Sequence, residues 1–257
     1  MRIGKLTRAT NETHVDVELN LDGAGVAKIS SGIGFFDHML NLFAAHGQFD
    51  LKVICAGDLE VDGHHSIEDI GIAMGAALKS ALGDKRGITR YGTFFLPMDE
   101  TLALVSLDIS GRPFLVCEVG ELAPMIGAFD TELVEEFLRA FAFNAGITLH
   151  VKIFYGKNSH HKVEAIFKAL GHALRAAVTV DEKIHGVEVF PSEANFLLIR
   201  LSRAEELKNY LESLGIGVRY FAPNSFGLKN CLRISIGTLA ENDEVFAAIK
   251  NFLEGAQ

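Results

Sequence analysis

A short motif that occurs twice constrains this chain more than any other feature. The run His64-His65-Ser66-Ile67-Glu68 returns 96 residues later as His160-His161-Lys162-Val163-Glu164. At the same offset Ile70 matches Ile166, Ala73 matches Ala169, Gly75 matches Gly171 and Leu78 matches Leu174. The sequence therefore predicts two copies of one folding unit, over about residues 1–93 and 94–185.

Both copies show the same order of strand and helix patterns. Alternation of polar and apolar residues predicts strands, and apolar residues three and four positions apart predict helices. The first copy reads as strands at 14–21, 26–29 and 49–56 and helices at 35–45 and 68–82; the second reads as strands at 102–109, 114–119 and 147–154 and helices at 131–143 and 163–178. Asp22-Gly23 is predicted to form a hairpin turn between the first two strands.

The motif has the geometry of metal ligands. Residues three or four apart on a helix share a face, whereas adjacent residues diverge by about 100°. Either histidine of a pair can therefore act beside its glutamate, but the two are expected to serve different ions. Imidazole and carboxylate ligands without cysteine suit Mn, Fe, Co or Zn, and a carboxylate-rich site with open positions favours Mn over structural Zn.

The helix that precedes each motif adds a further pair of candidate ligands. When these helices are aligned, His38 lies opposite Glu136. One pair of adjacent histidines is usually only surface polarity, but duplication of the whole pattern argues against that interpretation. Two ions are predicted, each with ligands from both halves of the chain or from different subunits.

Composition excludes several classes of protein. The net charge of −9 over 257 residues argues against a nucleic-acid partner. Three widely spaced cysteines indicate reduced thiols in a cytoplasmic protein. The start of the chain does not have the pattern of a signal peptide, and no run has the length of a membrane helix, so no membrane partner is expected.

Residues from about 2 to 185 resemble the imidazoleglycerol-phosphate dehydratases of histidine biosynthesis. The resemblance is carried by RATNET (8–13), FDHML (36–40), AHG (45–47), HHSIED (64–69), KRGITRYG (85–92), PMDE (97–100), SGRP (110–113), ITLH (147–150) and HHKVE (160–164). It implies an α+β fold, like domain 2 of ribosomal protein S5, in which duplicated half-domains of mixed β-sheet pack on helices. It also implies a homo-oligomer of 24 copies.

The resemblance implies a lyase that removes water from D-erythro-imidazole-glycerol phosphate and forms imidazole-acetol phosphate. Two Mn²⁺ ions are expected per active site, with the substrate's imidazole bridging them as an imidazolate. The implied metal ligands are His38, His64, His65, Glu68, Glu136, His160, His161 and Glu164. Glu136 stands where some members of the family have a histidine.

The implied substrate contacts include the ligands His38, His64, His65, Glu68, His160 and His161, together with Glu12, His46, Arg90, Arg112 and Lys168. Glu12 is the candidate for proton transfer, beside the motif residues His65, Glu68, His161 and Glu164 in the catalytic set. Arg90 and Arg112 are expected to bind the phosphate, because a guanidinium can contact two of its oxygens. His14, His150, His172 and His185 are interpreted as structural or surface residues.

Residues 186–257 depart from this family. The usual phosphate-binding serine and lysine loop is replaced after Pro191-Ser192. PSEANFLLIR (191–200), GIGVR (215–219) and CLRISIGT (231–238) instead resemble the C-terminal small domain of histidinol-phosphate aminotransferase. The segment is predicted to be a small α+β module with helices at 204–214 and 242–253. Because the large domain is missing, the module is expected to have no catalytic activity of its own.

Two alternatives stay open at this point. The replaced loop could leave a catalytically impaired enzyme, or a structural or storage assembly that binds metal without turnover. The C-terminal module could instead make the chain a scaffold for another protein of the pathway. Neither alternative explains Glu12, Arg90 and Arg112 together, so the dehydratase is the preferred interpretation.

Overall fold

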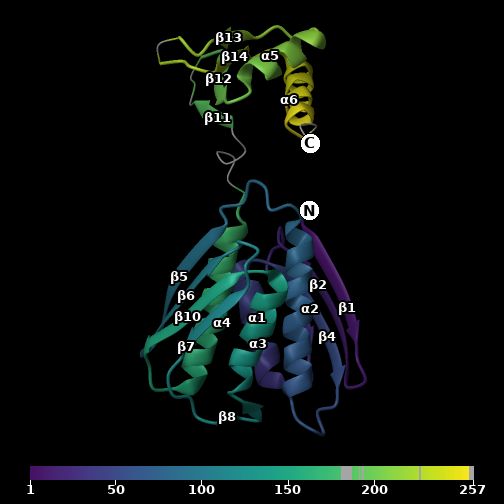
Figure 1. Cartoon of the computed structure of the whole chain (residues 1–257), viewed down its shortest axis with the longest axis vertical. Helices are drawn as coiled ribbons and strands as arrows, with labels where there is room; N and C mark the ends of the chain where they lie inside the picture. The colour runs from purple at the N-terminus through teal and green to yellow at the C-terminus, as the bar shows by residue number, and fades with distance from the viewer. Residues whose placement is uncertain (181–186, 191, 193, 226, 255–257) are drawn as a thin grey trace. The chain divides into compact units, whose positions relative to one another are not determined.

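The computed structural model describes residues 1–180, 187–190, 192, 194–225 and 227–254. The chain divides into two compact units, Met1–Thr179 and Val180–Gln257 (Figure 1). The predicted division between residues 185 and 186 lies outside the described residues, as do His185 and Pro191, and it stays a prediction. In the described part of the chain, no helix combines the length and the apolar character that crossing a membrane requires.

Each half of the first unit forms one four-stranded mixed sheet. The first contains β1 (Ile3–Ala9), β2 (Thr13–Asn20), β4 (Asp50–Gly57) and β3 (Ala27–Ser30), in the order β1-β2-β4-β3. The second contains β5 (Tyr91–Met98), β6 (Thr101–Asp108), β10 (Thr148–Tyr155) and β7 (Phe114–Glu118), in the order β5-β6-β10-β7. In both sheets only the last pair, β4 with β3 and β10 with β7, is parallel. The predicted duplication therefore extends to the sheet topology.

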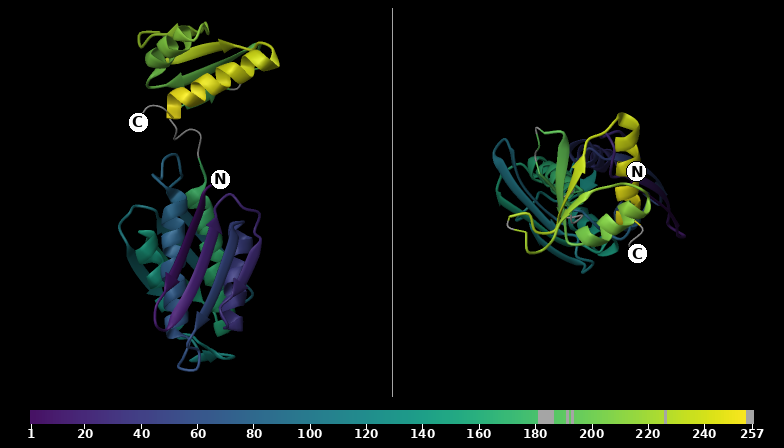
Figure 2. Two further views of the ribbon diagram at one scale, coloured as in Figure 1. Left: turned by 90° about the vertical axis from the view of Figure 1, so that its right-hand side faces the viewer. Right: turned by 90° about the horizontal axis from the view of Figure 1, so that it is seen from above.

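Four helices lie between the two sheets (Figure 1). They are α1 (Gly34–Gly47), α2 (His64–Leu82), α3 (Leu133–Ala145) and α4 (Ser159–Val178). The first sheet covers one side of this layer, as the purple strands in the left view of Figure 2 show. α2 packs on β1 and β2, and α4 packs on β5 and β6. The predicted α+β fold, with mixed sheets packed on helices, is confirmed.

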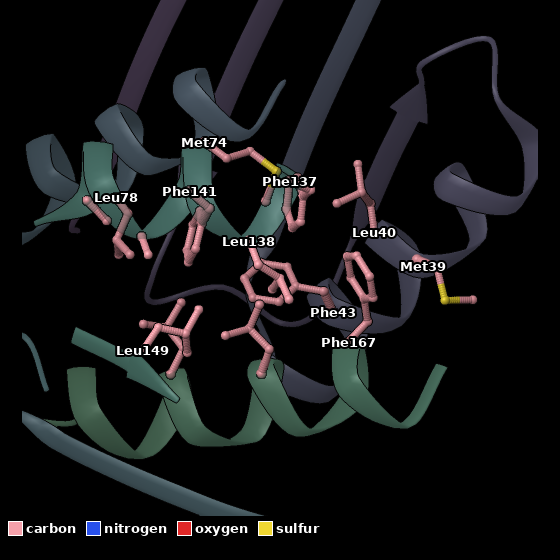
Figure 3. Packing of buried hydrophobic residues seen from close by; sticks show 14 of the residues in the cluster. Met39, Leu40, Phe43, Met74, Leu78, Phe137, Leu138, Phe141, Leu149 and Phe167 are labelled. Carbon is pink, nitrogen blue, oxygen red and sulfur yellow. The ribbon is translucent and has the colours of Figure 1, made fainter. Parts of the chain in front are cut away.

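The helices pair across the duplication: α1 packs with α4, and α2 packs with α3. Their shared core is rich in phenylalanine and methionine (Figure 3). Phe36 meets Phe137 with ring centroids 5.2 Å apart, and Phe137 meets Phe167 at 5.4 Å. All three rings are buried, so the aromatic core joins elements of both halves and neither half has a complete core alone.

Several sequence predictions differ from the structure, including the helix starts predicted at 68 and 163, which lie at His64 and Ser159. β3 does not form a hairpin with β2 but pairs in parallel with β4. The Asp50 carboxylate at the start of β4 accepts hydrogen bonds from the backbone N–H of Ala24 and Val26, and so holds this connection beside β4. β1 was not predicted, because its inward side contains Gly4, Leu6 and Arg8 and lacks an alternating apolar pattern. β5 was also not predicted, although Phe94, Leu96 and Met98 follow Gly92 on its inward side. The expected division at residue 93 falls inside β5.

Glycines set the distance between each sheet and its helix. A Cβ on Gly4 would lie 1.9 Å from the carbonyl oxygen of Ala77 in α2. A Cβ on Gly92 would lie 1.8 Å from the carbonyl oxygen of Ala173 in α4. Both contacts are with backbone, which cannot rotate away, so only glycine allows the helix this close to its sheet.

The second unit has a sheet and core of its own. β11 (Val187–Phe190), β12 (Phe196–Leu201), β14 (Cys231–Ser235) and β13 (Arg219–Phe221) form an antiparallel sheet in that order. Two helices, α5 (Ala204–Ser213) and α6 (Leu239–Glu254), complete the unit. Leu207, Leu211 and Leu232 are fully buried in its core. Both helices that the sequence predicts in this segment are present, although α6 begins three residues early.

Substitution of Gly92 by alanine tests the close approach of β5 to α4. The new methyl group would overlap a backbone oxygen, so we expect Gly92→Ala to lower the free energy of unfolding by about 1–3 kcal/mol. Gly34→Ala is the matched control, because nothing lies within 4 Å of a Cβ there. Thermal unfolding should show a lower midpoint for Gly92→Ala alone; equal midpoints would contradict the packing described here.

Candidate metal centre

Both copies of the repeated motif lie in the first turns of a helix. α2 begins at His64, whose backbone N–H donates to the Asp62 carboxylate at 2.7 Å. α4 begins at Ser159 and is capped by the Asn158 side chain, which accepts from the backbone N–H of His160 and His161. Each capped start presents two imidazoles and one carboxylate at the end of a helix, as the spacing of the motif requires.

Adjacent histidines diverge in the same way in both copies. The rings of His64 and His65 have centroids 6.3 Å apart and an interplanar angle of 81°. The corresponding values for His160 and His161 are 6.3 Å and 85°. Nearly perpendicular rings at this distance direct their nitrogens to different places, which supports the expectation that each histidine of a pair serves a different ion.

Three predicted ligands meet where α1 packs on α4. His38 from α1 and His160 and Glu164 from α4 have ligand atoms that all lie within 4.8 Å of one another. Glu164 Oε2 is 3.1 Å from Nε2 of His160 and 3.7 Å from Nε2 of His38. His38 is exposed and Glu164 is buried, so the group opens to solvent on the α1 side. It contains residues from both halves of the chain.

The chemistry of this His38–His160–Glu164 cluster fits a divalent cation. Burial by itself would raise the pKa of Glu164, but the Lys168 ammonium and the two histidines outweigh it and hold the pKa below its usual value. The carboxylate is therefore ionised, as a metal ligand must be. Lys168 Nζ lies 2.6 Å from Oε1 of Glu164, which leaves Oε2 facing the two imidazoles. Such nitrogen and oxygen donors suit Mn, Fe, Co or Zn.

The equivalent residues of the other copy do not form such a cluster. Among the described residues, His64, Glu68 and Glu136 are not brought within metal-binding distance of one another. The Glu136 carboxylate instead accepts a hydrogen bond from Arg139 at 2.8 Å. Arg139 occupies the position equivalent to Asn41 in α1, whose amide binds the carbonyl oxygen of Asp37. Arg139 pairs with both Glu135 and Glu136, whereas Asn41 carries no charge, so the two copies differ in the electrostatic partner at this position.

Two carboxylates orient the remaining histidines. Asp58 lies 3.0 Å from Nδ1 of His65, and Glu100 lies 2.7 Å from Nδ1 of His161. Each carboxylate raises the pKa of its histidine. A hydrogen bond at Nδ1 fixes the ring and presents Nε2 outward, the usual arrangement for a histidine that binds a metal. Sequence reasoning missed Asp58 and Glu100; PMDE, which contains Glu100, was quoted only as part of a resemblance.

Glu12 lies in the turn between β1 and β2. Its side chain is exposed, and its negative charge contributes to the raised pKa of His65. The backbone N–H of Glu12 donates to Oγ1 of Thr10 at 3.2 Å. The structure thus places the proposed proton-transfer carboxylate in the electrostatic environment of a motif histidine.

The two predicted phosphate-binding arginines converge on Asp108. Arg90 donates two hydrogen bonds to its carboxylate, at 2.7 and 3.1 Å, and Arg112 lies 3.7 Å from it. Both guanidinium groups are exposed, and Asp108 is mostly buried. Asp108 was not singled out in the sequence. It holds the two positive groups at one end of β6.

The substrate candidate His46 has a partner that the sequence did not identify. Nδ1 of His46 lies 3.1 Å from Nε2 of His172, a residue interpreted above as structural or surface. Burial lowers the pKa of both rings. The ring of Phe94 stacks on His172 with centroids 4.1 Å apart. His46 and His172 form a neutral pair. His172 lies on the same face of α4 as His160, Glu164 and Lys168, because these four residues follow one another at intervals of four.

The arginines and the metal cluster lie at opposite ends of α4. The backbone N–H of Arg90 binds the carbonyl oxygen of Ala177 near the C-terminus of the helix, whereas His160 lies at its N-terminus. At 1.5 Å per residue the two ends are roughly 25 Å apart. One small substrate cannot reach both ends within a single copy of the chain.

Comparison with known proteins identifies relatives of the first unit. The family model for imidazoleglycerol-phosphate dehydratase matches residues 31–174. The imidazoleglycerol-phosphate dehydratase of Clostridium botulinum (strain Langeland) is 61% identical over 185 residues, which cover 72% of this chain and 94% of that protein. The Staphylococcus aureus enzyme structure has a TM-score of 0.63 at 43% identity and covers 70% of this chain and 99% of its own. The Pyrococcus furiosus structure, in complex with (S)-C348, has a TM-score of 0.61 at 37% identity, covering 70% and 96%.

Loss of one cluster ligand should weaken metal binding. We expect His38→Ala to lower Mn²⁺ affinity by at least the roughly 10- to 100-fold that loss of an outer-shell partner causes. His150→Ala, which removes an exposed histidine from β10, is the control. Titration with Mn²⁺ followed by measurement of bound metal checks this prediction. Equal affinities in the two variants would exclude His38 as a ligand.

Proposed function

Because this chain belongs to the imidazoleglycerol-phosphate dehydratase family, we propose that it removes water from D-erythro-imidazole-glycerol phosphate with the help of two Mn²⁺ ions per active site. The product is imidazole-acetol phosphate. One observation carries the proposal: the His38–His160–Glu164 cluster combines ligands from both copies of the duplicated unit, at the position where the repeated motif meets its neighbouring helix.

The proposed ligands divide into two groups. His38, His160 and Glu164 hold one ion, and the equivalents His64, Glu68 and Glu136 are candidates for the other, with Glu136 first released from Arg139. His65 and His161 are held at Nδ1 by Asp58 and Glu100, and their Nε2 atoms, with Asp99 3.7 Å from that of His161, are candidate ligands for ions bound by another copy of the chain. When bound, the ions stabilise the anionic form of an imidazole ring and so activate an otherwise unreactive substrate.

Glu12 is proposed to move the proton. The substrate proton is not acidic, so its removal requires a base placed beside the carbon that carries it. Within the described residues, no hydrogen bond occupies the Glu12 carboxylate, whereas the equivalent Glu100 is bound to His161. A carboxylate free of partners and near His65 can accept a proton on one side of the bound ring.

The phosphate is proposed to be bound by Arg90 and Arg112. Their guanidinium groups keep their charge at any physiological pH, and Asp108 raises the pKa of Arg90 further. Lys168 and His46 act near the metal cluster instead, because Lys168 already contacts Glu164. The length of α4 separates these groups from the arginines, so the proposed active site combines residues from different copies in a homo-oligomer, of 24 copies by family resemblance.

Replacement of the phosphate-binding loop is the basis of one alternative to an active dehydratase. Without its serine and lysine, phosphate binding rests on Arg90 and Arg112, and the chain could be an impaired enzyme or a metal-binding assembly without turnover. An assay of the full-length protein with Mn²⁺ separates these possibilities. Bound metal without product formation would favour the assembly.

Removal of the Glu12 carboxylate should abolish most turnover. We expect Glu12→Gln to lower kcat by about 10²- to 10⁴-fold, the usual contribution of general acid–base catalysis, while bound Mn²⁺ stays unchanged. Product formation and metal content are measured on the same preparation. Glu18→Gln, which changes a half-buried glutamate further along β2 that pairs with Lys5 at 2.9 Å, is the control. Wild-type turnover in Glu12→Gln would disprove the assigned role.

A mixing experiment tests the shared active site. His160→Ala disrupts the metal end and Arg90→Gln the phosphate end, so each protein alone should be nearly inactive. Co-expressed with different affinity tags and purified through both tags, they should recover activity, because some sites then combine intact residues from each copy. A pair of variants with the same damaged end, His160→Ala and Glu164→Gln, should recover none. Failure of the first pair would place the whole site within one copy.

A further inference from the structure

An ionic triangle of Asp69, Arg8 and Thr13 anchors the turn that carries Glu12; Asp69 and Thr13 are buried, and the Arg8 side chain is 37% exposed. Asp69 in α2 is 5% exposed, and its carboxylate accepts a hydrogen bond from Nε of Arg8 at 2.8 Å. The other carboxylate oxygen accepts from Oγ1 of Thr13, which is 4% exposed. Arg8 is in β1 and Thr13 opens β2, so one buried carboxylate connects both strands of the hairpin to α2.

The triangle continues into the turn through Thr10. Oγ1 of Thr10 accepts hydrogen bonds from the backbone N–H of Thr13, at 2.9 Å, and of Glu12, at 3.2 Å. It also lies 3.2 Å from Oγ1 of Thr13. The backbone N–H of Thr10 donates to the carbonyl oxygen of Thr13. A continuous chain of hydrogen bonds thus runs from Asp69 to the backbone of Glu12.

Comparison of the β1–β2 hairpin with the equivalent β5–β6 hairpin of the second copy separates what stability requires from what is specific to the first copy. Strand registers align β1–β2 with β5–β6, so that Thr13 corresponds to Thr101 and Arg8 to Leu96. The motif offset aligns Asp69 with Ala165. Leu96, Thr101 and Ala165 are all buried. The paired strands are separated by three residues in the first copy and by two in the second. An apolar contact therefore supports an equivalent hairpin, and buried ion pairs are often no more stabilising than apolar groups in their place.

The two turns also differ in the hydrogen bonds that their glutamate carboxylates make. Glu100 accepts hydrogen bonds from the backbone N–H of Lys157 and Asn158 and contacts His161, so its carboxylate is fixed directly. In the described residues, the carboxylate of Glu12 has no such partner. Its position is therefore set by the backbone of the turn, which the triangle braces.

We propose that Asp69 is a positioning residue for Glu12: through Arg8, Thr13 and Thr10 it holds the turn so that the Glu12 carboxylate meets the substrate. This inference rests on the proposed dehydratase function. Asp69 is buried and both of its carboxylate oxygens are hydrogen-bonded within the chain, so it acts on Glu12 through the turn. The ionic triangle is retained in the first copy for catalysis, since the second copy folds with leucine and alanine in its place.

Asp69→Asn tests the proposal with little change in shape. We expect kcat to fall by about 10- to 100-fold, as for other outer-shell residues, with KM and bound Mn²⁺ unchanged. Thr13→Val, which removes the hydroxyl that bonds to Asp69, should behave in the same way. Asp22→Asn is the matched control, because Asp22 also pairs with an arginine, Arg2, at 2.6 Å, but lies just beyond the opposite end of β2. Its kcat should equal that of the wild type.

A double variant separates positioning from stability. Arg8→Leu combined with Asp69→Ala installs the residues of the second copy in the first, so the thermal midpoint should stay near that of the wild type while kcat falls as in Asp69→Asn. Wild-type kcat in this variant would overturn the proposal. Loss of bound Mn²⁺ in Asp69→Asn would also overturn it, because Asp69 would then act through the adjacent Glu68.

Glu12→Gln distinguishes failure of this inference from failure of the proposed function. If Glu12→Gln is inactive and Asp69→Asn is fully active, only the positioning role is wrong. If Glu12→Gln is fully active, the proton-transfer role of Glu12 is wrong and the positioning role falls with it.

Discussion

Pairing of helices across the duplication is the constraint on which this structure depends. α1 of the first half packs on α4 of the second, and α2 packs on α3. Glycines make both approaches possible: a Cβ on Gly75 would lie 2.5 Å from the carbonyl oxygen of Phe141, and one on Gly171 would lie 2.6 Å from that of Phe43. The packing of α1 on α4 also brings His38 to His160 and Glu164, so the interface that completes the core assembles a cluster that could hold a metal ion.

Duplication supplied two equivalent sets of residues, and the two sets have diverged. Glu100 is a fixed partner of His161, whereas the carboxylate of its equivalent Glu12 has no hydrogen-bond partner within the part of the chain that the structure describes. Arg139 neutralises Glu136, whereas the equivalent Asn41 leaves His38 to the cluster. A symmetrical scaffold can thus support an asymmetric reaction, because electrostatic partners at a few positions decide which copy of a residue is ordered, neutralised or free.

Much of the fold could be predicted because its helices and inner strands have strong apolar periodicity. α1 to α4 follow from residues such as Phe36 and Phe43, which recur on one helical face. β1 escaped prediction because Gly4 and Arg8 interrupt the apolar pattern on its inward side, with the glycine where α2 approaches. The parallel pairing of β3 with β4 also escaped, since Asp50 and its backbone partners lie more than twenty residues apart. Local patterns do not encode contacts over that distance.

The sequence by itself determined the duplication, the ligand types and the family, because spacing on a helix and ordered motifs are properties of the chain as written. Only the tertiary structure decided which ligands meet. It joined His38 to His160 and Glu164, gave His65 and His161 the carboxylates of Asp58 and Glu100, and connected Asp69 to the turn of Glu12. The physical reason is that hydrogen bonds and ion pairs act over about 3 Å. Residues far apart in the sequence reach that distance only when helices and strands pack.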